Sequence, residues 1–239
     1  MKPETELSPV SQLAPLSRLH IFLSSPGDVT DERALAKEVI TRLENERAHR
    51  DRLRLEIVAW DKPGAGTAMP AHLEPQAALD QGLRKPSACD IVVVIFGYRM
   101  GTPLSEKHRK PNGERYGSGT EYEYLDALNA ARQSGSIPEV LVYRKQGAPD
   151  VNAADPQRKE KLEQWDRVET FFAGFKNVDG SFGSYYKTYA APSQFKEMLD
   201  DDLRDIVARY LAKQAPAAHP PPLVAEPAEA PVWLERLPT

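Results

Sequence analysis

The sequence predicts an α/β domain built on a parallel sheet of five strands in the order 2-1-3-4-5, with helices on both faces. Two observations lead to this prediction. Short apolar runs alternate along the chain with segments of helical periodicity, and right-handed crossovers between such strands place helices on both sides of a sheet. Residues 91–96 (I-V-V-V-I-F) are apolar throughout, which is typical of a central parallel strand. The expected arrangement is flavodoxin-like.

Local patterns define the individual elements. Runs rich in β-branched, aliphatic or aromatic residues predict strands at residues 18–24, 53–60, 91–96, 139–143 and 185–189. Helical periodicity predicts one helix after residue 28 and others at residues 76–85, 118–133, 156–175 and 193–213. Asp28 is the expected N-cap of the first helix, because aspartate side chains accept hydrogen bonds from unpaired N–H groups at helix starts.

The folded domain is expected to occupy residues 18–213. Residues 1–17 are polar and contain prolines, so we expect a disordered lead-in. Residues 214–239 are rich in alanine and proline and end in a small apolar cluster around Trp233. Such a composition favours a linker that tethers the domain to a sensor or NTPase domain or to a partner protein, or else a disordered C-terminus.

Composition and charge exclude several classes of function. A net charge of -4 lacks the basic excess of a sequence-independent nucleic-acid binder. No apolar stretch approaches the roughly 20 residues that a membrane span needs. A single cysteine, Cys89, excludes an internal disulfide framework and fits a reducing compartment, so a cytoplasmic location is expected. The five histidines have no ligand spacing with one another or with Cys89, so no metal site is predicted.

Two chain segments are predicted to meet in a crevice at the carboxyl edge of the sheet. In a 2-1-3-4-5 sheet the topological switch point lies between the first and third strands, where α/β proteins bind ligands. The long loop at residues 97–117 then leads to a helix whose first turns carry two glutamates, Glu121 and Glu123. The residues predicted to line the crevice are Ser24, Ser25, Gly27, Trp60, Gly97, Tyr98, Arg99, Ser118, Thr120 and Glu123. Hydroxyls, an aromatic face, an arginine and a carboxylate are the groups that bind a ribose, a base and a phosphate.

Each of these residues also has a purely structural interpretation. Ser118-x-x-Glu121 and Thr120-x-x-Glu123 both fit a capping box, in which the glutamate bonds back to the start of its own helix. The serines after the first strand can simply shape a turn. Arg99 can be a solvated loop arginine, and Trp60 can pack in a core or loop. The spacing alone leaves these alternatives open.

Three segments together resemble a known family. They are S-S-P-G-D-V-x-x-E-R from Ser24, C-D-I-V-V-V-I-F-G-Y-R-M-G-T-P from Cys89 and S-G-T-E-Y-E-Y-L-D-A from Ser118. This pattern resembles the TIR-like domains at the N-termini of bacterial STAND-type NTPases and NLR-like defence proteins, over residues 20–211. The resemblance implies the flavodoxin-like fold and self-association. It further implies either hydrolysis of NAD⁺ at the nicotinamide–ribose bond by one glutamate or a non-catalytic adaptor role.

The glutamate that the resemblance assigns to catalysis is Glu123. NAD⁺ is then a substrate, and no separate cofactor is expected. Residues 119–127 are also similar to the G-T-x-x-E-x-x-x-A segment of nucleoside deoxyribosyltransferases, whose glutamate attacks the anomeric carbon. Three functions therefore follow as alternatives: a NAD⁺ hydrolase activated when copies are brought together, an interaction module, and a nucleoside base-exchange enzyme.

Overall fold

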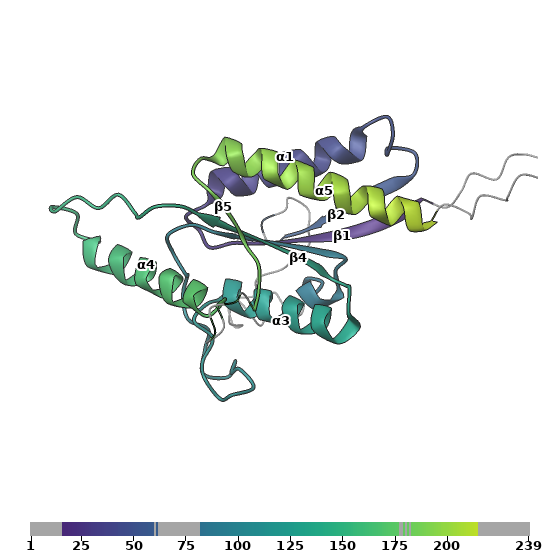
Figure 1. The fold of residues 1–239 in the computed structure, drawn as a ribbon. Helices are drawn as coiled ribbons and strands as arrows, with labels where there is room; N and C mark the ends of the chain where they lie inside the picture. The colour runs from purple at the N-terminus through teal and green to yellow at the C-terminus, as the bar shows by residue number, and fades with distance from the viewer. Residues whose placement is uncertain are drawn as a thin grey trace, which may run out of the picture.

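The computed structural model describes residues 16–59, 61, 82–176, 179, 181 and 183–214. Parallel strands form the centre of this part of the molecule. The strands are β1 (Ser17–Ser24), β2 (Leu53–Val58), β3 (Ile91–Phe96), β4 (Glu139–Lys145) and β5 (Lys187–Tyr189). They form one sheet in the order β2-β1-β3-β4-β5, and every neighbouring pair is parallel. The predicted fold class and strand order are therefore confirmed (Figure 1).

Helices cover both faces of this sheet. The helical elements are α1 (Thr30–Asn45), the 3-10 turn η1 (Pro86–Ala88), α3 (Gly119–Ser134), α4 (Arg158–Ala173) and α5 (Pro192–Gln214). Figure 1 shows α1 and α5 side by side above the sheet and α3 and α4 below it. The side chains of β3 alternate between the two cores of the molecule. Ile91, Val93 and Ile95 lie in the core on the α1 and α5 side. Val92, Val94 and Phe96 lie in the core on the α3 and α4 side. This explains why its sequence is apolar at every position.

Several boundaries differ from the predictions. β4 continues to Lys145, and α4 is shorter at both ends than the predicted 156–175. The predicted strand at 185–189 forms only over its last three residues, Lys187–Tyr189, and the side chain of Tyr185 is 74% exposed. The chain before β5 instead lies against the end of α3, where Arg132 donates hydrogen bonds to the carbonyl of Gly183 and the hydroxyl of Ser184.

Some predictions fall outside the described residues. These are the lead-in before residue 16, the tail after residue 214, Trp60, and most of the predicted helix at 76–85. Within the described part of the chain, no helix is long and apolar enough to cross a membrane.

Cys89 lies directly before β3 and is buried, with 2% of its surface exposed. Burial raises the pKa of its thiol to about 12, so the thiolate that acts as a nucleophile or metal ligand is scarce near neutral pH. Among the described residues, no cluster of histidine, cysteine and acidic side chains has metal-binding geometry.

Candidate active site

The start of α3 separates the roles of its two glutamates. Ser118 is the N-cap, and its Oγ accepts a hydrogen bond from the backbone N–H of Glu121 at 3.0 Å. Glu121 turns back to the same helix start, where its Oε2 accepts a hydrogen bond from the N–H of Gly117 at 2.5 Å. Its Oε1 lies 2.6 Å from Nζ of Lys110. Ser118 and Glu121 therefore cap the start of α3, and Thr120 is not the N-cap. Thr120 is a buried residue inside the first turn.

Glu123 points to the sheet instead of its own helix start. Its Oε2 accepts a hydrogen bond of 2.5 Å from Oγ of Ser24, the last residue of β1. Ser24 is 1% exposed and lies in register with Val94 of β3. The carboxylate therefore lies at the carboxyl ends of the two strands that flank the switch point, where the sequence predicted it.

An arginine that the sequence interpretation missed supports the adjacent loop. Arg33 of α1 donates hydrogen bonds from NH1 to the carbonyl of Leu23 and to Oγ of Ser25, both at 3.1 Å. The same guanidinium binds Asp61 in a bidentate pair, with N–O distances of 3.0 and 2.7 Å. Lys37 also contacts Asp61, at 2.7 Å. Hydrogen bonds from Arg33 and then Lys37 hold the pKa of Asp61 well below its usual range.

Asp28 is not the N-cap of α1, and that prediction was wrong. Val29 occupies the N-cap position without a side-chain bond. The Oδ2 atom of Asp28 instead accepts hydrogen bonds from the backbone N–H groups of Tyr98 at 2.7 Å and Arg99 at 3.1 Å, directly after β3. Burial raises the pKa of Asp28, although these two N–H groups act in the opposite direction. The carboxylate thus joins the loop after β1 to the loop after β3 across the switch point.

Gly97 is required where these two loops meet. A Cβ at this position would overlap Oδ2 of Asp28 and lie 2.7 Å from Cγ1 of Val29. Because two backbone N–H groups fix the Asp28 carboxylate, we expect Gly97→Ala to lower the free energy of unfolding by about 1–3 kcal/mol, measured by urea denaturation. Gly27→Ala is the matched control, because a Cβ there meets nothing within 4 Å. Equal losses in the two variants would show that the close approach at Gly97 is unimportant.

The side chains of Tyr98 and Arg99 contact partners outside the Ser24–Glu123 pair. The Tyr98 hydroxyl donates a hydrogen bond to the carbonyl of Gln146 at 2.9 Å. Arg99 is exposed and lies 3.7 Å from Glu160 of α4. The predicted contact of Arg99 with a phosphate stays a prediction. Trp60, predicted to stack on a base, is outside the described residues.

A second buried polar contact also escaped the sequence interpretation. Glu32 is 1% exposed and pairs with Nζ of Lys145, at the end of β4, at 3.0 Å. The neighbouring Tyr189 is fully buried, and burial together with the charge of Glu32 raises the pKa of its hydroxyl. A signal for Glu32 was present in the sequence, because it lies four residues before Ala36 on the buried stripe of α1.

Comparisons with known proteins add little to this geometry. The sequence matches no protein-family model and no curated protein. Among solved structures, the chain is similar to translation elongation factor SelB from Methanococcus maripaludis in its apo form, with a TM-score of 0.32 and 11% sequence identity. The match covers 83% of this chain but only 34% of that chain. A match at this TM-score supports no inference about function.

Proposed function

We propose that this chain is a TIR-like effector domain that hydrolyses NAD⁺ at the nicotinamide–ribose bond, with Glu123 as its catalytic carboxylate. One observation carries the proposal. Glu121 performs the capping at the start of α3, and Glu123 instead meets Ser24 at the carboxyl edge of the sheet. A carboxylate near the switch point of such a sheet, bonded to a strand-end hydroxyl, supports this role, because α/β proteins bind ligands at this edge.

The reaction needs little beyond such a group. Nicotinamide in NAD⁺ is a cationic leaving group, so its departure requires no strong general acid. The transition state has oxocarbenium character, and a fixed negative charge beside the ribose stabilises it. The hydrogen bond from Ser24 fixes one carboxylate oxygen of Glu123, so the charge needs no reorientation during the reaction.

The setting that we propose is a cytoplasmic defence or signalling system. Copies of the domain self-associate, and the proline-rich residues 214–239 tether it to a sensor or NTPase domain or to a partner protein. The proposal involves neither a membrane nor direct binding of nucleic acid, and it needs no cofactor besides NAD⁺ as substrate.

The test is to incubate the purified protein with NAD⁺ over a range of protein concentrations and to measure free nicotinamide by chromatography. Release that rises more steeply than protein concentration is expected if association activates the enzyme. Parallel incubations with free nucleosides and a free base test for base exchange. Turnover of nucleosides but not of NAD⁺ would favour the deoxyribosyltransferase alternative. Turnover of neither, at any concentration, would favour a non-catalytic interaction module.

A further inference from the structure

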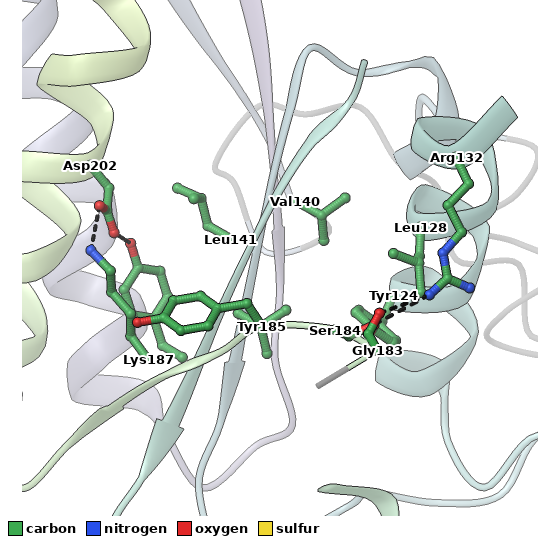
Figure 2. Close-up of a pocket in the computed structure, with 12 residues that line it drawn as sticks. Tyr124, Leu128, Arg132, Val140, Leu141, Gly183, Ser184, Tyr185, Lys187 and Asp202 are labelled. Carbon is green, nitrogen blue, oxygen red and sulfur yellow. Dashed lines mark hydrogen bonds and ion pairs between the residues drawn. The ribbon is translucent and has the colours of Figure 1, made fainter. Parts of the chain in front are cut away.

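The first half of β4 has an open edge. β5 pairs only with Tyr143, Arg144 and Lys145, so the strand from Glu139 to Val142 has no neighbour on its outer side among the described residues. Two hollows follow this edge and share Leu128, Arg132, Val140 and Leu141 in their walls. Their volumes are about 230 and 350 Å³. Figure 2 shows Val140 and Leu141 between Asp202 and Lys187 on one side and Arg132 and Ser184 on the other.

The divergence of the chain before β5 leaves this edge open. Gly183 donates a hydrogen bond from its N–H to the carbonyl of Phe175, and Arg132 of α3 holds Gly183 and Ser184. This segment therefore lies towards the α3 and α4 face and returns to β4 only at Lys187. At the other end of the edge, Pro138 directly precedes the strand and has no backbone N–H.

The hydrogen bonds of β4 with its neighbours show which of its backbone groups face outwards, away from β3. The N–H of Glu139 donates inwards to the carbonyl of Asp90, and the N–H of Gln146 donates outwards to the carbonyl of Tyr189. Because successive residues of a strand direct these groups to opposite sides, Val140 and Val142 direct theirs outwards. The register of Tyr143 with Lys187 directs the N–H of Lys187 to the carbonyl of Val142. Among the residues that the structure describes, the outward groups without a backbone partner are the Pro138 carbonyl, both groups of Val140, and the Val142 N–H.

This set of groups is complementary to itself. We propose that a second copy of this chain pairs with it along β4, antiparallel and about a two-fold axis at Val140. In that register the N–H and carbonyl of Val140 bond those of Val140 in the other copy, and the N–H of each Val142 bonds the carbonyl of the opposite Pro138. All open groups on both edges are then paired. The N–H that Pro138 lacks would have faced the Val142 carbonyl, which β5 already occupies.

Exposed apolar side chains at the two ends of the edge also favour pairing with a second copy of this chain. Among the described residues, three large hydrophobic side chains are exposed, and two of them are Ile137 at 51% and Tyr185 at 74%. Ile137 precedes the open edge, and Tyr185 precedes β5 at its far end. Antiparallel pairing brings Ile137 of one copy to the start of β5 in the other, so that both side chains lose exposed apolar surface. This inference does not depend on the enzymatic proposal.

The experiment is sedimentation velocity of the whole protein over a range of concentrations, with the variants Val140→Pro and Val140→Thr. Proline removes the outward N–H of Val140 and leaves the hydrogen bonds between β4 and β3 in place. Loss of the two symmetric bonds predicts a dimer dissociation constant raised by about thirtyfold or more. Threonine keeps the N–H, so the control variant should dimerise like the wild type.

A second variant keeps the test decisive if Val140→Pro does not fold. Ile137→Lys replaces an exposed apolar side chain, which the proposed dimer would bury, by a charged one, so it should also weaken the dimer. Hydrogen exchange provides an independent readout, because the amides of Val140 and Val142 should exchange more slowly in the dimer. A wild-type protein that stays monomeric, or a folded Val140→Pro variant that dimerises normally, would overturn the proposal.

Discussion

Replacing Glu123 by glutamine is expected to lower kcat for nicotinamide release by about a hundredfold or more, while the fold stays intact. Glutamine is isosteric, and its carbonyl oxygen can still accept the hydrogen bond from Ser24. In the proposed reaction, the substitution therefore removes the negative charge that would stabilise the oxocarbenium-like transition state, and it leaves the geometry of α3 in place. Steady-state kinetics by nicotinamide release, with circular dichroism of the same sample, measures both effects.

Glu121→Gln is the matched control, because the two glutamates are only two residues apart on the same helix. Glu121 accepts the N–H of Gly117 and pairs with Lys110, so its loss should lower stability by about 0.5–2 kcal/mol. Its side chain does not extend to the end of β1, and we expect kcat to stay close to that of the wild type. If Glu123→Gln released nicotinamide as fast as Glu121→Gln, Glu123 would have no catalytic role.

The fold could be predicted because its signals are local and repeat along the chain. Each strand carries its own apolar run, and the connections between parallel strands leave few possible orders. The proximity of Ser24 and Glu123 was predictable for the same reason. Once the strand order is known, the end of β1 and the start of α3 are both expected at the carboxyl edge of the sheet. The start of β5 could not be predicted in this way. Tyr185 and Tyr186 are residue types that favour strands, but the hydrogen bonds of Arg132 to Gly183 and Ser184 hold the chain before β5 against α3.

The roles of the two glutamates could not be assigned from the sequence. Ser118-x-x-Glu121 and Thr120-x-x-Glu123 satisfy the same capping rule, and the position of the helix start relative to β1 decides between them. Asp28 shows the same limit, because its carboxylate finds backbone partners 70 and 71 residues further along the chain. Contacts of this kind depend on tertiary structure, which local patterns do not encode.

Arg33 escaped the sequence interpretation because charged residues in the first turn of a helix are usually solvated. Its side chain is only 8% exposed, and its donors bind the Leu23 carbonyl, the Ser25 hydroxyl and Asp61. It therefore connects the end of β1, next to the candidate catalytic pair, with the residue that follows β2 by three positions.

Arg33→Met is expected to lower the free energy of unfolding by about 3 kcal/mol at pH 7, measured by urea denaturation. Methionine fills a similar volume but leaves the Leu23 carbonyl and the Ser25 hydroxyl without their donor and removes the bidentate partner of Asp61. Lys37→Met is the control, since Lys37 makes one contact with Asp61 and is more exposed, so it should lose about 1 kcal/mol.

Acid should reduce the difference between the Arg33→Met variant and the wild type. The pKa of Asp61 is depressed in the folded protein by the hydrogen bonds from Arg33 and Lys37, so the carboxylate stabilises the fold above its unfolded pKa, about 3.9. Below this value the unfolded chain binds a proton at Asp61 that the folded protein does not yet bind, so the contribution shrinks as the pH falls towards the folded pKa. The wild type should therefore lose more stability than Arg33→Met between pH values of about 4 and 2. A difference between the two proteins that stays constant over this interval would mean that Arg33 stabilises the fold by packing alone and not by its pairing with Asp61.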